Sequence, residues 1–354
     1  IIMSNEYIFF GSFLLFIIFM MAIDLGVFNK GDHTVGFRKA MLMSCIWISF
    51  ALGFYVLLIS HGELLHGITS MEQLEHVAKR YLHSITLIPG DFEASLGLYK
   101  QNLGLEFLTG YVIEYALSVD NIFVMVMIFN AYRVEEKYYH RVLFWGIIGA
   151  VLMRFLFIFI GASLISRFEW ILYLFGAFLI YTGIMLLANS DQEEEIDPEK
   201  HTIVRLASKY FSVLPRFEGN HFFVKQDGKT YVTPLFLVLL IVEFSDLIFA
   251  VDSIPAIFAV TKDPYIVFFS NIFAILGLRS MFFLLVNIIH KFHYLKYGLA
   301  FLLLFIGIKM LAHHWLVAWW GFTTVHSLLV ILAILAISII TSLLFSPKQN
   351  EIKS

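Results

Sequence analysis

Long runs of apolar residues separated by short polar segments dominate this chain. A helix needs about 20 apolar residues to cross the hydrocarbon core of a bilayer, and each run approaches or exceeds that length. The pattern therefore predicts an all-α polytopic membrane protein with nine transmembrane helices. The predicted spans are residues 7–28, 40–60, 106–130, 142–165, 170–188, 234–259, 265–289, 295–312 and 323–345.

Composition supports lipid as the solvent. Of 354 residues, 60% are hydrophobic and only 14% are charged, whereas soluble domains have about 45–50% and 25%. A net charge of −3 indicates no nucleic-acid partner. The chain has no GxxxxGK[ST] motif, which excludes a P-loop ATP motor within it. The one cysteine, Cys45, excludes a disulfide framework, and its apolar neighbours predict a buried, inert thiol.

An acidic pattern occurs twice. Glu114 is followed six residues later by Asp120, and Asp246 is followed six residues later by Asp252. In both cases a valine precedes the second acid and a small polar residue follows it. The pattern indicates that the third and sixth predicted spans are copies of each other.

The following spans repeat as well. Arg154 of the fourth span matches Arg279 of the seventh, and residues 183–188 match 307–312. Spans 3–5 therefore repeat as spans 6–8, and a unit with an odd number of spans must be inverted in its second copy. Such an inverted three-plus-three helix repeat is typical of secondary transporters.

These patterns divide the chain into six parts. Lys and Arg gather in the alternate segments that place the N-terminus outside and the C-terminus in the cytoplasm. The parts are two N-terminal transmembrane helices (1–60), an external loop (61–105), the first repeat (106–188), a cytoplasmic connector (189–233), the second repeat (234–312), and a C-terminal helix with a short tail (313–354).

Charges inside the spans need partners, because each costs at least about 2.5–3.5 kcal/mol at the bilayer centre. The third and sixth spans together carry Glu114, Asp120, Glu243, Asp246 and Asp252. The nearby bases that pair with or gate them are Arg154, Arg279 and Lys309. The excess of acids is balanced by a divalent cation or by protons. In the alternative interpretation, the acids pair with the bases only to lock the bundle.

The donor atoms in these two spans are hard oxygens. Asp120, Asn121, Asp252 and Ser253 form a pseudo-symmetric set, one pair from each repeat, with the other acids nearby. Such oxygen donors favour Mg²⁺, Ca²⁺ or Mn²⁺. Asp24, near the end of the first span, is either a gate ligand or an interfacial cap.

Helical geometry leaves two alternatives for the acid pairs. Six residues rotate a straight helix by about 240°, so Glu114 and Asp120 do not share a face. Either the acids face different partners, or the helices unwind near Ser118 and Pro255. In the predicted connector, Asp227 and Gly228 lie between β-forming residues and predict a short hairpin. The histidines and carboxylates of the predicted external loop allow either cation capture or an ordinary polar surface.

Several stretches resemble the TerC/Alx family of bacterial membrane proteins. They are DLGVF (24–28), EYALSVDNIF (114–123), HRVLFWG (140–146), VEFSDLIFAVDSIPAIFAV (242–260) and SNIFAILGLRS (270–280). The resemblance implies a nine-helix bundle in the bacterial plasma (inner) membrane with acidic repeats lining a central path. It also implies manganese export, an association with tellurite resistance, and loading of metal onto secreted enzymes. The site residues that it carries over are Glu114, Asp120, Asn121, Glu243, Asp246, Asp252 and Asp24.

The leading hypothesis is a secondary transporter that exports a divalent metal cation, Mn²⁺ above others, as cargo rather than as a cofactor. Protons are a candidate coupling ion, and a homo-oligomer is compatible with the sequence. The alternative is a membrane scaffold for metal loading or tellurite and metal stress resistance without direct transport. An intramembrane aspartyl protease is disfavoured because its Gly-x-Gly-Asp motif is absent, so no enzyme is expected.

Overall fold

The computed structural model describes most of the chain. The described residues are 2–28, 36–83, 85–168, 170–188, 209, 211–214, 216–226, 228–286, 294–312, 315–316, 319 and 321–344. For residues 2–5 and 24–28 only the backbone is described.

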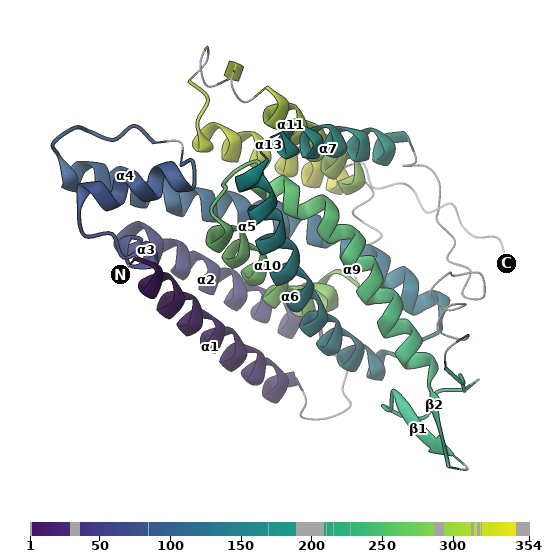
Figure 1. Cartoon of the computed structure of the whole chain (residues 1–354). Coiled ribbons are helices and arrows are strands. Elements are labelled where there is room, and N and C mark those ends of the chain that lie inside the picture. Colours follow the sequence, from purple (N-terminus) through teal and green to yellow (C-terminus); the bar gives the residue numbers. More distant parts are fainter. Residues whose placement is uncertain are drawn as a thin grey trace.

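The fold is a helical bundle with one small hairpin at its edge (Figure 1). Its elements are α1 (Ile2–Phe28), α2 (Phe37–His61), α3 (Glu63–His66), α4 (Met71–Arg80), α5 (Phe92–Ala131), α6 (Glu136–Arg167), α7 (Ile171–Ala188), β1 (Phe223–Gln226), β2 (Lys229–Val232), α9 (Pro234–Phe258), α10 (Pro264–Leu285), α11 (Leu295–Leu311) and α13 (Thr324–Leu344).

Eight of the described helices are long and apolar enough to cross a membrane. They are α1, α2, α5, α6, α7, α9, α10 and α13. The eighth predicted span corresponds to α11, which has 17 residues and is shorter than the usual spanning length. The structure thus shows a multi-pass, all-α membrane protein, while a count of nine spans stays a prediction.

Helix α10 lies at the centre of the bundle. An 18-residue stretch of it is buried throughout, and it packs against α2, α5 and α6. Phenylalanines fill the space between it and the outer helices. The ring centroids of Phe13 on α1 and Phe269 on α10 lie 4.2 Å apart, and those of Phe54 on α2 and Phe273 on α10 lie 5.0 Å apart. Polar side chains on α10 are therefore held away from lipid.

The contacts between helices are compatible with the predicted inverted repeat. Helices α5 and α6 each contact both α9 and α10, and α7 lies along α11. A Cβ added at Gly307 of α11 would lie 2.7 Å from the carbonyl oxygen of Gly176 on α7, so these backbones approach closely. Exchanging α5, α6 and α7 for α9, α10 and α11 leaves this set of contacts unchanged. The inverted repeat itself stays a prediction, with these contacts compatible with it.

The segment predicted as an external loop contains regular structure. Residues 61–105 contain α3, α4 and the first turns of α5, which begins 14 residues earlier than the predicted third span. The Asp91 side chain caps α5 by accepting a hydrogen bond from the backbone N–H of Ala94 at 3.0 Å. Helix α5 has 40 residues, about 60 Å of helix, so it extends beyond a bilayer core. Its polar first turns hid it from a search for apolar runs.

Two smaller predictions have different outcomes. The hairpin is confirmed, because β1 and β2 pair antiparallel with Gln226 opposite Lys229. The prediction that Cys45 is buried is wrong, because this side chain is exposed on α2. Apolar neighbours do not distinguish a position that faces lipid from one that faces the core, since both are apolar.

Candidate cation site in the bundle core

Arg154 of α6 lies at the centre of the acidic cluster. Its side chain has no exposed surface. Its Nη1 donates hydrogen bonds to Glu114 of α5 and to Asn271 of α10, and it lies 3.4 Å from the hydroxyl oxygen of Ser253. Its Nη2 lies 3.6 Å from Oδ1 of Asp246 on α9. One guanidinium thus neutralises an acid from each predicted repeat.

The guanidinium group of Arg154 does not satisfy every polar atom of the cluster. Among the described residues, the second carboxylate oxygens of Glu114 and Asp246 have no hydrogen-bond partner, and neither do Nε and Nη2 of Arg154. Buried polar atoms are nearly always satisfied in folded proteins, so each exception needs an explanation. Here two carboxylates keep an oxygen capable of binding a cation or a proton.

A second pair of acids lies six residues further along each of these two helices. Asp120 of α5 and Asp252 of α9 are within electrostatic reach of each other, and both are half-buried. The hydroxyl of Thr182 on α7 donates a hydrogen bond to Oδ1 of Asp252 at 3.3 Å. Each pair joins one acid of α5 to its counterpart on α9. Glu114 with Asp246 is called the first tier, and Asp120 with Asp252 the second tier.

This arrangement decides between the two geometric alternatives. Helix α5 is continuous from Phe92 to Ala131, and α9 continues past Pro255 to Phe258. The alternative in which the helices unwind is therefore wrong. The two acids of each helix instead face different partners, because straight helices place them on different faces.

Glu243 and Asn121 lie at the edges of this cluster. Glu243 is half-buried on α9 and interacts electrostatically with Asp246. Its carboxyl group fills the space beside Gly149 of α6, so closely that a Cβ at Gly149 would collide with it. Asn121 is buried on α5, next in sequence to the second tier.

The other predicted gating residues lie elsewhere. Nη2 of Arg279 lies 2.9 Å from Nδ1 of His140 on α6. Nζ of Lys309 on α11 donates a hydrogen bond to the carbonyl oxygen of Ala259 at the end of α9, at 3.2 Å. Asp24 lies on α1, but its side chain is outside the described part of the structure.

Two polar residues of the cluster were missed by the sequence analysis. Asn271 binds Arg154, and Thr182 binds Asp252. The signal for Asn271 was available, since an amide within an apolar spanning segment is costly and usually has a partner. The signal for Thr182 was weak, because a hydroxyl in a spanning helix commonly bonds its own backbone. The single hydroxyl proton of Thr182 is shared between the carbonyl oxygen of Phe178 and Asp252.

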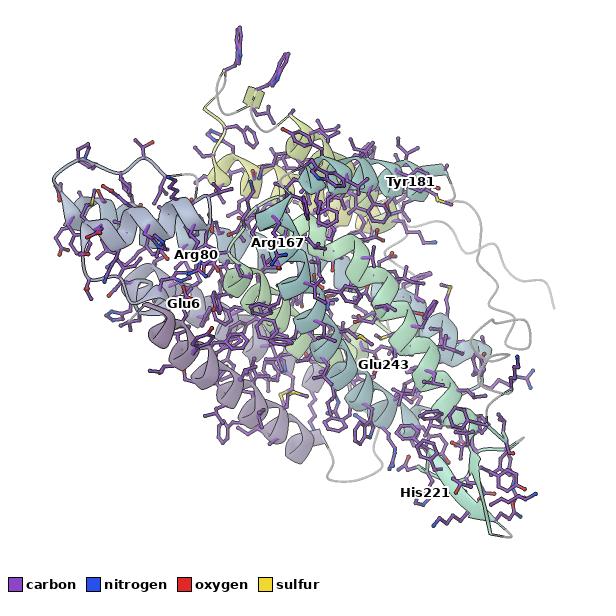
Figure 2. All side chains as sticks on the ribbon, viewed as in Figure 1. Glu6, Arg80, Arg167, Tyr181, His221 and Glu243 are labelled. Carbon is purple, nitrogen blue, oxygen red and sulfur yellow. The ribbon has the colours of Figure 1, made fainter. Side chains whose placement is uncertain are left out.

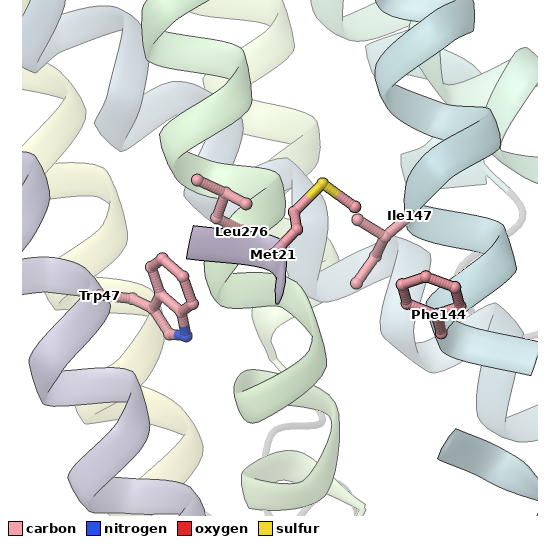
Figure 3. Close-up of a pocket in the computed structure, with 5 residues that line it drawn as sticks. All are labelled: Met21, Trp47, Phe144, Ile147 and Leu276. Carbon is pink, nitrogen blue, oxygen red and sulfur yellow. The ribbon is translucent and has the colours of Figure 1, made fainter. Parts of the chain in front are cut away.

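The carboxylates of the cluster are arranged in pairs. Among the described residues, no group of three or more His, Cys, Asp or Glu side chains is arranged to hold a metal ion. The donors within each tier are carboxylates supplemented by serine, threonine or asparagine oxygens. A small pocket between α1, α2, α6 and α10 is lined instead by Met21, Trp47, Phe144, Ile147 and Leu276 (Figure 3). Its apolar lining offers no cation ligands.

Comparison with known proteins supports a membrane role. Residues 99–350 match the model of the integral membrane protein TerC family, which covers the whole acidic cluster. The chain is 44% identical over 303 residues to an uncharacterized membrane protein of Myxococcus xanthus, covering 85% of this chain and 82% of the relative. No solved structure matches the chain.

Other relatives carry the name Alx. The Salmonella typhi protein is 42% identical over 302 residues, covering 85% of this chain and 84% of the relative. The Escherichia coli K12 protein is 41% identical over 307 residues, again covering 85% and 84%. Their name describes a proposed membrane-bound redox modulator. The family description indicates no catalytic activity.

Proposed function

We propose that this chain, which belongs to the TerC family of integral membrane proteins, is a secondary transporter that exports a divalent metal cation, with Mn²⁺ as the preferred ion. The observation that carries the proposal is the pairing of acids from α5 and α9 in two tiers inside the bundle, the first of which holds Arg154. Transporters bind their ions near the midplane, where repeated units meet.

Arg154 acts in this proposal as an internal counter-ion. Its guanidinium occupies the first tier between Glu114 and Asp246, and it neutralises these acids when no metal is bound. A divalent cation that enters the second tier binds to the carboxylates of Asp120 and Asp252. Movement of the cation into the first tier then requires the guanidinium to move away, which couples ion movement to a change in helix packing.

The donor chemistry selects the class of ion. Carboxylate, hydroxyl and amide oxygens bind Mg²⁺, Ca²⁺ and Mn²⁺ well and discriminate against soft ions that prefer thiolates. Mn²⁺ export is also what the resemblance to the TerC/Alx family implies. Protons that bind the same carboxylates in the absence of metal are the proposed coupling ion.

The name of the Alx relatives suggests a different class of function, which the composition of this chain constrains. A chain with one cysteine forms no intramolecular dithiol pair, so thiol–disulfide exchange within it is not the proposed activity. A scaffold that supports metal loading or stress resistance without transport is the outcome if no metal flux is found.

The experiment is metal uptake into inside-out vesicles that contain the full chain. The wild type should accumulate Mn²⁺, and Asp120→Asn and Asp252→Asn should lose uptake while inserting normally. Glu136→Gln is the matched control, because this exposed glutamate begins α6 away from the cluster. Competition by Mg²⁺ and Ca²⁺ tests ion preference, and a pH-sensitive dye inside the vesicles tests proton exchange. Absence of flux from folded wild-type protein, or normal flux in both variants, would refute the proposal.

A further inference from the structure

A second cluster of buried ionisable groups lies at the end of the bundle that carries α3 and α4. There His66 of α3 connects two carboxylates that are far apart in the sequence. Its Nδ1 lies 2.7 Å from Oε1 of Glu6 on α1, and its Nε2 lies 2.9 Å from Oδ2 of Asp263. The three side chains are 0%, 3% and 0% exposed. His66 falls in the segment predicted as an external loop, and Glu6 and Asp263 are not among the predicted site residues.

The two contacts together require an extra proton. A carboxylate only accepts hydrogen bonds, and a neutral imidazole carries one N–H. Two ring nitrogens that both face carboxylate oxygens therefore need either a doubly protonated ring or a protonated carboxyl group. In both cases the Glu6–His66–Asp263 triad holds one proton more than a neutral histidine with two carboxylates. A doubly protonated ring has no lone pair for a metal ion, so the ligand of this site is a proton.

Neighbouring donors keep both carboxylates ionised and place the proton on His66. Glu6 accepts hydrogen bonds from the hydroxyl groups of Tyr81, at 3.2 Å, and Tyr265, at 3.3 Å. Asp263 caps α10, because its Oδ1 accepts a hydrogen bond from the backbone N–H of Tyr265 at 2.9 Å. Other charged and titratable groups on this side include Arg80, which lies 3.9 Å from Glu6, and the His83–Glu106 pair. Among the described residues, Tyr7, Tyr99 and Lys309 also interact electrostatically with members of this group.

Burial by itself lowers the pKa of His66, but the Asp263 and Glu6 carboxylates raise it to about 9. Burial likewise lowers the pKa of His83, and Glu106 raises it above its usual value. Against the effect of burial, His66 holds the pKa of Asp263 below its usual range. The raised pKa of His66 and the lowered pKa of Asp263 agree with a doubly protonated imidazole between two ionised carboxylates.

The triad joins parts of the bundle that the chain does not connect locally. Glu6 belongs to α1, which lies at the edge of the bundle (Figure 1), and Asp263 belongs to the junction of α9 and α10. Figure 2 shows Glu6 and Arg80 at the same end of the molecule. Loss of the proton leaves a nitrogen lone pair facing a carboxylate oxygen, which is repulsive, so one of the two contacts breaks.

We propose that the Glu6–His66–Asp263 triad is a proton-binding site whose bound proton fastens helix α1 to the α9–α10 junction, and that release of this proton opens the α3–α4 end of the bundle. The site shares no residue with the two tiers of acids, so it stands whether or not the chain transports metal.

A titration of the full chain in lipid nanodiscs tests proton binding. Hydrogen–deuterium exchange at the histidine C2 position, followed by mass spectrometry, gives a midpoint for each histidine. The midpoint of His66 should lie above the ordinary histidine value and should fall in Asp263→Asn, which keeps a side chain able to cap α10. The midpoint of exposed His76 should not change with that substitution. A midpoint for His66 that is ordinary, or that ignores Asp263→Asn, overturns the proposal.

Thiol accessibility tests the opening. In a Cys45→Ser background, the buried Leu65→Cys is compared with the exposed Leu64→Cys, because these neighbours on α3 are 0% and 56% exposed in the wild type. The ratio of their maleimide labelling rates cancels the effect of pH on the thiol itself. It should rise about tenfold per pH unit between the ordinary histidine pKa and the His66 midpoint and then level off, as for an opening linked to one proton. A ratio that is flat with pH, or that rises equally in His66→Gln, overturns the proposal.

Discussion

Arg154 donates a hydrogen bond to Glu114, and neither side chain has any exposed surface. The two residues come from different helices and are joined by Asp246 from a third. Removing one partner of a buried ion pair leaves an uncompensated charge, which is far more costly than replacing the pair as a whole. The stability of variants of Arg154 and Glu114 therefore shows how charge is balanced in the first tier.

Arg154→Gln should destabilise the protein by about 3–5 kcal/mol, because Glu114 and Asp246 lose their shared counter-charge. Thermal unfolding in nanodiscs measures the loss, with exposed Arg167→Gln on the same helix as the control. The double variant Glu114→Gln/Arg154→Gln should lose less than the sum of the two single variants, since it removes both charges together. Additive losses would show that the two residues are not coupled.

Asp252→Asn should raise stability while it abolishes transport. Asp120 and Asp252 repel each other when both are ionised, and asparagine removes one charge while it can still accept the hydrogen bond from Thr182. A gain of about 1 kcal/mol is expected, as is common where a functional site is strained by like charges. A fall in melting temperature would show that the second tier is not electrostatically strained.

Gly149→Ala should change the site without changing any ionisable group. The new methyl group would occupy the position of the Glu243 carboxyl group, so that side chain must move. Uptake of Mn²⁺ should fall, and the comparison with Glu243→Gln tells whether the loss comes from displacing the carboxylate. Gly146→Ala is a suitable control on the same helix, because its Cβ would lie at an ordinary 3.5 Å from Val242. Equal activity of Gly149→Ala and Gly146→Ala would mean that the position of Glu243 is unimportant.

Stability should fall as pH rises from about 6.5 to about 9. The pKa of His66 is raised from 6.5 to about 9, so its contribution is complete below the unfolded value and is lost as pH passes through the folded one. The loss is on the order of 3 kcal/mol, at 1.36 kcal/mol for each pKa unit, and His83 acts in the same direction. Unfolding midpoints measured across this range should flatten in His66→Gln. A wild-type profile that is flat between these pH values would contradict the assignment of a charged His66.

The sequence by itself determined the class of the protein and identified the four acids of the two tiers. Long apolar runs are read directly from composition because a bilayer requires them locally. Glu114, Asp120, Asp246 and Asp252 were found because a charge in such a run is rare and costly. The hairpin was predicted for a similar reason, since a turn depends on a few adjacent residues.

Only the tertiary structure decided which groups meet. That Arg154 serves both Glu114 and Asp246 depends on the rotation of three helices relative to one another, which apolar runs do not encode. The exposure of Cys45 was not readable either, because lipid and protein core favour the same residues. His66 looked like part of a polar loop until folding placed it between Glu6 and Asp263, 60 and 197 residues away. The sequence thus identifies charges that must be neutralised in the membrane, and the packing of distant segments determines which groups neutralise them.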